Sequence, residues 1–377
     1  MIKVAIVAVE QSGDTIGASL IKALRRKSNQ IEVLGVSGPE MRSAGCTSLG
    51  NIDDLSVMGI VDVIRNYPRL KRLQRELINM FLERKINVFV GIDGPDFNLG
   101  IAQRLKAKRI RTIQFVCPQV WAWREARVKK IGASIDQMLA LFPFEESFFL
   151  RKGLNTRYVG HPLADLLELL PRKKEARNNF KLRGDGIVLA LMPGSREAEI
   201  NHHLYTFLEA AQIIRDSSVR PVNIVVGSPS QKFEKKMGQF KNDFSYQVVV
   251  GDSRGTLTAA DVAIVTSGTV TLESMLCGTP MVVAYKTAPI NYFVLSRLIN
   301  IQYISLPNIL TNSNIVPELL QDEVNSANIV AEVNKWLSDK ARRDAFYMRS
   351  RAVHQKLKRN SASLAADVIF EELDDDK

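Results

Sequence analysis

Cysteine, histidine and acidic metal motifs are sparse in this sequence, and their absence excludes several kinds of site. The 377 residues hold three cysteines, Cys46, Cys117 and Cys277, and no CxxC pair. Isolated cysteines argue against a disulfide framework or a zinc site and are typical of a reducing compartment. The four histidines lack ligand spacing, and no internal DxD pair is present to hold a divalent ion. We therefore expect no metal site.

Long apolar runs and a glycine fingerprint are missing as well. No run of about 18 apolar residues exists that would span a membrane. The N-terminal stretch MIKVAIVAVEQSGD passes from a short apolar run directly into glycine and acid, which indicates a first strand and not a signal peptide. The turn after it is not GxGxxG, so a nicotinamide-dependent enzyme is disfavoured and no cofactor is expected.

Positive charge, by contrast, is abundant and unevenly placed. The chain has 51 Lys and Arg against 40 Asp and Glu, and residues 1–160 hold 25 of the former and 15 of the latter. Nearly the whole excess of +11 therefore belongs to the first half, as expected of a domain that faces a polyanion or an anionic membrane. The alternative is a solvated basic surface without a partner. No RNP, KH or helix-turn-helix pattern is present, so no nucleic acid is expected.

The apolar runs are short, rich in valine and isoleucine, and separated by stretches of helix length such as 15–27, 99–108, 197–215 and 269–277. Continuous apolar strands, each followed by a helix, are typical of parallel sheets covered on both faces. Two series of such strands predict two doubly wound α/β domains. The expected strands are 3–9, 32–37, 87–92, 112–116, 137–142 and 156–159, then 187–192, 222–227, 246–250, 262–266 and 280–285.

The boundary between the domains is predicted in the charged stretch 171–186, which has no strand pattern. The first domain would cover residues 1–170 and the second residues 171–344. The end of the chain reads as helix until DDDK, so we expect residues 345–377 to cross back to the first domain or to pack on a partner chain. The sequence is thus compatible with a homodimer.

Two segments look amphipathic. Residues 57–82 carry apolar positions near helical spacing with arginines and lysine between them, and Pro68 predicts a split into two helices. A basic amphipathic helix can lie in a membrane interface, although it can equally pack on its own sheet with a solvated basic face. Residues 288–310 would line an acyl-chain groove or belong to the core.

Ligands of doubly wound sheets bind beyond the carboxyl ends of the strands, so the turns that follow strands are the candidate sites. The first is EQSGD, where the helix start after Glu10 can hold an oxyanion or sugar hydroxyls, unless Ser12 or Asp14 simply caps the helix. The second is the stretch NVFVGIDGPDFN. Asp93 follows its strand at once, and a carboxylate there can serve as a general base; Asp96 is the better candidate for a helix cap.

The second domain offers two further turns. In LMPGSREAEI, a strand runs into Pro193-Gly194-Ser195-Arg196 and then a helix. Gly194 lets the backbone approach a ligand, the helix start offers free amides, and Arg196 supplies a forked cation, which together suit a diphosphate. In VTSGTVTLESMLCGTP, the polar turn Ser267-Gly268-Thr269 opens a helix, and Glu273 can accept both hydroxyls of a ribose. This second pattern is typical of a nucleotide-sugar donor site.

A series of motifs runs the length of the chain: SGDTIGASLIKAL, LSVMGIVDV, VFVGIDGPDFN, PQVWAWREARVKKIG, LFPFE, VGHPLAD, LMPGSREAEI, SGTVTLESML and YISLPNIL. In these motifs the chain resembles the lipid-A-disaccharide synthase family of glycosyltransferases. The resemblance implies a GT-B-type fold of two Rossmann-like domains facing a cleft, and metal-independent transfer of 2,3-diacylglucosamine from UDP to 2,3-diacylglucosamine 1-phosphate (lipid X). The product would be a β-1,6-linked disaccharide, formed with inversion at the cytoplasmic, anionic face of the inner membrane.

The resemblance also implies roles for matching residues. Asp93 would be the catalytic base. The donor would be bound by Gly194, Ser195, Arg196, Ser267, Gly268, Thr269, Glu273 and Asn308, and the acceptor or first-turn set would be Glu10, Ser12, Asp14, Met58 and Trp121. The chain departs from the family pattern at Val9, where glycine is usual, and at Cys117 and Gln119, where serine is usual. The remaining alternative is another two-domain UDP-sugar enzyme, such as a lipid-linked cell-wall transferase or a UDP-N-acetylglucosamine epimerase.

Overall fold

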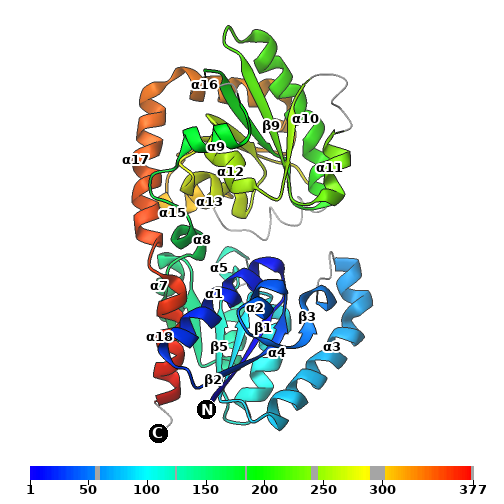
Figure 1. Ribbon diagram of the computed structural model, residues 1–377, viewed down its shortest axis with the longest axis vertical. Helices are drawn as coiled ribbons and strands as arrows, with labels where there is room; N and C mark the ends of the chain where they lie inside the picture. Colours follow the sequence, from blue (N-terminus) through cyan, green and yellow to red (C-terminus); the bar gives the residue numbers. More distant parts are fainter. Residues whose placement is uncertain (56–59, 124, 183–184, 239–244, 289–301, 375–377) are drawn as a thin grey trace. The chain divides into compact units, whose positions relative to one another are not determined.

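The chain folds into two compact units, each with its own sheet (Figure 1). The computed structural model describes residues 1–55, 60–123, 125–182, 185–238, 245–288 and 302–374, without the side chains of 60–66, 122, 123 and 125. Unit 1 comprises Met1–Asp165 and Leu357–Lys377, and unit 2 comprises Leu166–Lys356. Each unit is described by itself below.

Unit 1 is built on a parallel seven-stranded sheet in the order β3-β2-β1-β4-β5-β6-β7. The central strands β1 and β4 are almost wholly apolar and bury both faces, as the continuous valine and isoleucine runs predict. The strands are β1 (Ile2–Ala8), β2 (Ile31–Ser37), β3 (Thr47–Asn51), β4 (Val88–Ile92), β5 (Arg111–Phe115), β6 (Gln137–Ala140) and β7 (Thr156–Tyr158). Strand β3 was not predicted, because its polar sequence TSLGN occupies a half-exposed edge of the sheet.

Helices cover the sheet of unit 1 and follow most of its strands. They are α1 (Gln11–Lys27), α2 (Pro39–Ser43), α3 (Ile60–Glu83), α4 (Pro95–Lys106), α5 (Val120–Trp123), α6 (Val128–Ser134), α7 (Pro143–Arg151), α8 (Pro162–Leu166) and α18 (Ser361–Asp374), with 3-10 turns at Ile52–Asp54 and Glu125–Arg127. The predicted split at Pro68 is wrong, since α3 runs through it as one helix. Pro68 is exposed, so water can replace the one backbone hydrogen bond that it removes.

Unit 2 has a parallel six-stranded sheet in the order β10-β9-β8-β11-β12-β13. Its strands are β8 (Ile187–Met192), β9 (Val222–Ser228), β10 (Gln247–Val250), β11 (Val262–Val265), β12 (Met281–Tyr285) and β13 (Glu318–Leu320). The three-residue edge strand β13 was not predicted, because it is too short to carry a pattern. Its helices are α9 (Lys173–Asn179), α10 (Glu197–Ser217), α11 (Gln231–Gly238), α12 (Ser253–Ala259), α13 (Thr269–Leu276), α15 (Leu306–Thr311), α16 (Ser326–Ser338) and α17 (Lys340–Leu357), with a 3-10 turn at Gln321–Glu323.

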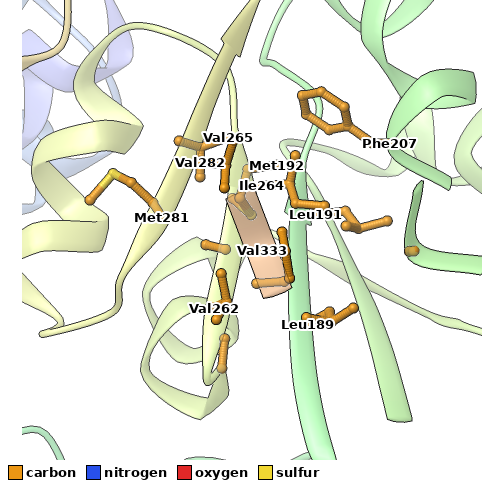
Figure 2. Close-up of a cluster of buried hydrophobic side chains, with 14 of the residues drawn as sticks. Leu189, Leu191, Met192, Phe207, Val262, Ile264, Val265, Met281, Val282 and Val333 are labelled. Carbon is orange, nitrogen blue, oxygen red and sulfur yellow. The ribbon is translucent and has the colours of Figure 1, made fainter. Parts of the chain in front are cut away.

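The core of unit 2 lies between its sheet and the helices that pack on it (Figure 2). Leu189 on β8 and Ile264 on β11 are fully buried, with Phe207 from α10 and Val333 from α16 in the same cluster. At about 25 cal/mol per Å² of apolar surface removed from water, each such side chain contributes roughly 1.5–3 kcal/mol. This rigid layer fixes the ends of β8 and β11, which carry the two candidate turns.

The chain enters unit 2 earlier than the charged stretch 171–186, at Leu166. That stretch belongs to unit 2 because Lys173 and Arg177 both pair with Asp261, at 2.6 and 2.7 Å. The chain returns to unit 1 at Leu357, at the end of α17.

The last helix, α18, packs on α1 in unit 1 (Figure 1), as predicted for a C-terminal helix that crosses back. Its start is capped by Asp165, whose carboxylate accepts the N–H groups of Asn360 and Ser361 at 2.7 and 2.6 Å. Lys27 of α1 also pairs with Asp367 of α18. The cap and the ion pair tie the C-terminal segment to the first sheet.

Within the described residues, no helix combines the length and apolarity required to cross a bilayer. All three cysteines are buried and unpaired.

Candidate functional site

In unit 1 the candidate turns lie side by side at the point where the strand order reverses. Strands β1 and β4 are neighbours although β2 and β3 separate them in sequence, and their register pairs Ala8 with Ile92. The turn that contains Glu10 and the turn that contains Asp93 therefore leave adjacent strand ends. Such a switch point is where doubly wound sheets bind ligands.

Asp93 occupies a constrained position in this turn. Its backbone and that of Gly94 are both left-handed, with φ of 55° and 44°. The side chain is half-buried, and its Oδ1 accepts the N–H of Gly94 at 2.8 Å. Burial raises the pKa of Asp93 above its ordinary value, and the bond from Gly94 opposes that rise only in part. A carboxylate with a raised pKa is a better proton acceptor than an ordinary aspartate.

Val9, one of the departures from the family pattern, packs against the Asp93 turn. A Cβ at Gly94 would lie 2.4 Å from Cγ2 of Val9, so the turn accepts only glycine there. Val9 thus fills space directly beside the residue that follows Asp93.

Asp96 is separate from this arrangement. It lies exposed in the first turn of α4 and pairs with Arg127. The helix is capped by Gly94 and makes no side-chain cap, so Asp96 is not the predicted N-cap. Of the two acids of the GIDGPDFN stretch, Asp93 alone is half-buried at the strand end.

The first-turn residues divide into exposed and structural ones. Glu10 and Ser12 are exposed at the start of α1, and no side chain caps that helix. Asp14 is fully buried, and its carboxylate accepts the N–H groups of Gly38, Glu40 and Met41 at 2.8, 2.8 and 3.1 Å. Its alternative role as cap of its own helix is therefore wrong: it caps α2. Because these bonds occupy its oxygens, Asp14 holds the start of α2 against α1.

Trp121 lies half-buried beside a carboxyl that the sequence did not single out. Its ring meets Phe144 edge-on, with centroids 5.0 Å apart, and its indole and the Cys117 thiol lie near the buried Glu145 side chain. Glu145 Oε2 also accepts the N–H groups of Leu141 and Phe142 at 3.2 and 3.1 Å. Burial nevertheless dominates and raises the pKa of Glu145 to about 7.

The raised pKa makes stability depend on pH. A carboxyl whose pKa is higher in the folded chain contributes stability that is present below the unfolded pKa and is lost as pH rises through the folded one. Wild type should lose about 3 kcal/mol of unfolding free energy between pH 4.5 and pH 8 from this group. In Glu145→Gln that slope should vanish, while Glu146→Gln, its half-buried neighbour, should retain it. Urea unfolding at a series of pH values measures this, and an unchanged slope in Glu145→Gln would refute the assignment.

Unit 2 repeats the arrangement at its own switch point. Strands β8 and β11 are neighbours, and their register pairs Met192 with Val265. The turns that contain Ser195 and Gly268 therefore leave adjacent strand ends. Two turns that the sequence predicts for one donor are thus brought together.

The turn after β8 is shaped by Glu199. Gly194 has a φ of 123°, and a Cβ there would lie 2.4 Å from that of Glu199, so only glycine fits. Glu199 Oε2 accepts the N–H groups of Ser195 and Arg196 at 3.0 and 3.3 Å. The prediction that these amides are free is therefore wrong. The signal in the sequence is the glutamate three residues after Arg196, a spacing typical of a capping box, in which that side chain accepts the backbone N–H of the N-cap residue. The Arg196 guanidinium remains 64% exposed, 3.6 Å from Glu199.

The turn after β11 is open. Gly268 has a φ of 126°, and it is exposed together with Thr269 at the start of α13. Ser267 is half-buried and donates to the carbonyl of Ile304 at 3.1 Å. Glu273, one turn further on, accepts from Ser253 Oγ at 3.1 Å, and burial raises its pKa.

Asn308, for which a donor-binding role is predicted, lies inside unit 2. It is fully buried, its Oδ1 accepts the N–H groups of Ile315 and Val316, and its Nδ2 donates to the Val316 carbonyl and to Glu318. Its amide holds the loop after α15 in place and presents no free group to a ligand. Glu318, which also accepts from Ser305, completes that network.

Some predicted features fall outside the described part of the chain. Met58 lies there, as do residues 289–301 of the second amphipathic segment. Among the residues that the structure describes, no three His, Cys, Asp or Glu side chains form a group suited to hold a metal ion.

Comparison with known proteins covers both units. The family model of lipid-A-disaccharide synthetase matches residues 4–371. The chain is 37% identical over 378 residues to the lipid-A-disaccharide synthase of Glaesserella parasuis serovar 5, with 98% of this chain and 97% of the relative covered. It is 39% identical over 372 residues to the enzyme of that name from Pseudomonas aeruginosa, with 98% of each covered.

Solved structures share the two-unit GT-B fold at low identity. A putative UDP-N-acetylglucosamine 2-epimerase from Listeria monocytogenes superimposes with a TM-score of 0.66 at 12% identity, covering 98% of this chain and 94% of that one. A calicheamicin glycosyltransferase gives 0.62 at 15%, covering 99% and 98%. These likenesses show the fold alone, whereas the sequence matches extend through all four candidate turns. The chain belongs to the lipid-A-disaccharide synthetase family.

Proposed function

We propose that this protein is an inverting glycosyltransferase that joins UDP-2,3-diacylglucosamine to lipid X and releases UDP and a β-1,6-linked disaccharide 1-phosphate. The observation that carries the proposal is the family match over residues 4–371, which includes both switch points. The chemistry of the turns agrees with it, because one unit offers a cation and open amides and the other a raised-pKa carboxylate.

Unit 2 is proposed to bind the donor. Glu273 would accept the ribose hydroxyls, and the exposed amides at Gly268 and Thr269 suit phosphate oxygens at the start of α13. Arg196 would stabilise the negative charge that develops on the departing UDP. Ser195 and Gly194 shape that turn, and Asn308 would act by holding its loop.

Unit 1 is proposed to act on the acceptor. Asp93 would take the proton of the acceptor 6-hydroxyl as that oxygen attacks the anomeric carbon and the bond to UDP breaks. One base on the face opposite the leaving group gives inversion, by the same geometric logic as in inverting glycosidases. Glu10, Ser12 and Trp121 would contact the acceptor, while Asp14 supports the backbone of α2.

The decisive assay is incubation of the purified protein with UDP-2,3-diacylglucosamine and lipid X. We expect stoichiometric UDP and disaccharide, with undiminished rate in EDTA. The same protein given UDP-N-acetylglucosamine should form neither a disaccharide nor an epimer. Turnover of that unacylated donor, or no turnover of the acylated one, would favour the alternative of another UDP-sugar enzyme of this fold.

The lipid substrates require contact with a membrane, and we propose the anionic cytoplasmic face of the inner membrane. Helix α3 presents Arg72 and Arg75 to solvent. Cations near an anionic surface contribute about 1 kcal/mol each, and salt screens them. Binding to phosphatidylglycerol vesicles should therefore weaken as salt rises.

The variant Arg72→Gln/Arg75→Gln should bind those vesicles about thirtyfold more weakly than wild type, because it loses about 2 kcal/mol from two cations. Its control, Lys232→Gln/Lys235→Gln, removes two exposed cations from α11 of unit 2 and should bind normally. Vesicle sedimentation measures both. Equal losses in the two variants would show that net charge, and not α3, governs the attachment.

A further inference from the structure

The ends of β4 and β5 carry an unusual backbone conformation. Asp93 and Val116 are left-handed, with φ of 55° and 77°, and the register of these adjacent strands pairs Ile92 with Phe115. The left-handed region is costly for residues other than glycine and most of all for a β-branched one. Such backbone persists only where the surroundings hold it, and it gathers at functional sites.

Two buried amide side chains hold the backbone here. The carbonyl oxygen of Asp93 accepts Nδ2 of Asn98 at 2.8 Å and Nε2 of Gln114 at 3.1 Å. Gln114 Nε2 also lies 3.4 Å from the carbonyl of Val116, and Asn98 Nδ2 lies 3.3 Å from that of Val7. The two amides therefore connect the carboxyl ends of β1, β4 and β5, and both donate to the carbonyl oxygen of Asp93.

This arrangement costs stability. Oδ1 of Asn98 and Oε1 of Gln114 are buried without a hydrogen-bond partner among the described residues. Burying an acceptor in that state is unfavourable. Gly91 makes room for the pair, since a Cβ there would lie 2.7 Å from Cβ of Asn98 and 2.9 Å from Oε1 of Gln114. The two amides thus donate to backbone carbonyls of this site while their own oxygens stay unpaired, so hydrogen bonding for stability does not by itself account for them.

We propose that Asn98 and Gln114 are positioning residues for the reaction: by bonding to the Asp93 carbonyl they lock its backbone in the left-handed form and so fix the direction of its carboxylate. This inference rests on the proposed role of Asp93 as the base. Neither amide touches the reacting atoms, and both act through the backbone that they hold.

The first test compares two buried glutamines. Gln114→Met removes one of the two donors to the Asp93 carbonyl. Gln137→Met removes a matched buried donor on β6, whose Nε2 bonds to the Met138 carbonyl at 3.1 Å. Both variants should lose similar thermal stability. Gln114→Met alone should lower kcat, on the order of tenfold to a hundredfold, with KM for donor and lipid X within about twofold of wild type. Equal kcat in the two variants would overturn the proposal.

The second test is a double-mutant cycle on residual activity. If Gln114 acts through Asp93, then adding Gln114→Met to Asp93→Asn should lower kcat little further. If Gln114→Met instead causes an independent structural defect, the fold-losses of kcat in the two single variants should multiply in the double variant. Multiplicative loss overturns the positioning role and leaves Asp93 as the base. Near-normal turnover of Asp93→Asn by itself overturns the role of Asp93 and, with it, this inference. Should Gln114→Met fail to fold, Gln114→Asn keeps a buried amide but draws it back from Asp93, and the same loss of kcat is expected.

Discussion

Asp93→Asn is expected to yield a folded protein that forms disaccharide a hundredfold to ten-thousandfold more slowly than wild type. A positioned general base contributes on that scale, and the amide cannot accept the proton of the acceptor hydroxyl. The loss should fall on kcat, because the carboxylate acts when the proton moves. Single-turnover measurement of UDP release with lipid X in excess isolates this step.

The structure explains why this variant should fold. Asparagine is among the residues that best tolerate the left-handed region in which Asp93 lies, and its Oδ1 can still accept the Gly94 N–H. The matched control is Asp96→Asn, which changes the exposed acid of the same turn and its pairing with Arg127. Similar losses in both variants would mean that local charge, and not proton transfer, is what the assay detects.

The pH dependence supplies an independent check. In the proposed mechanism Asp93 accepts the proton only when it is ionised, so kcat/KM should fall as pH drops through its pKa. Because burial raises that pKa, the acid limb should lie above the range of an exposed aspartate. Asp93→Asn should lose this limb. An identical limb in wild type and variant would assign it to another group.

The sequence was most informative where elements are buried and continuous. Strands such as β4 and β8 bury both faces, so their valine and isoleucine runs predict them within about one residue. The edge strands β3 and β13 were not predicted, because a half-exposed or three-residue strand has no continuous apolar run in the sequence. Helix α3 was predicted broken because Pro68 is costly in a helix interior, and that rule fails where the residue faces solvent.

The candidate site residues also divide into those that local sequence features locate and those whose role depends on burial. Spacing after a strand located Asp93 and the Ser267-Gly268-Thr269 turn, because strand ends and glycine turns are local features. It could not tell that Asp14 and Asn308 are buried organisers, since their partners, such as Gly38 and Glu318, come from other elements. Burial decides whether a polar side chain serves a ligand or the fold, and burial is a tertiary property.

Each unit has a carboxylate that accepts backbone N–H groups at a helix start near its candidate turns. In unit 1, the buried Asp14 ties α1 to the start of α2, and in unit 2, the half-buried Glu199 ties Ser195 and Arg196 to α10. Preorganised turns hold donors and cations in place before substrate arrives, which is where most electrostatic stabilisation originates. A consequence for the donor turn is that the amides of Ser195 and Arg196 are already bonded, whereas the guanidinium of Arg196 stays largely exposed beside Glu199.

Arg196→Ala should therefore lower kcat/KM by about a hundredfold to a thousandfold, the scale of losing one preorganised group that meets developing charge. Its side chain is largely exposed and its ion pair with Glu199 lies at the surface, so stability should change little. Arg196→Lys should recover part of the loss, because a lysine keeps the charge but not the fork that suits a diphosphate.

The control for this prediction is Arg215→Ala, at the other end of the same helix α10. It should leave turnover unchanged, which separates the effect of the donor turn from a general loss of positive charge on unit 2. A rise in KM for the UDP-sugar with unchanged kcat would show that Arg196 binds donor and transition state equally. Wild-type kcat/KM in Arg196→Ala would return this residue to the structure of the turn and leave Thr269 and the amides of α13 as the groups that face the leaving diphosphate.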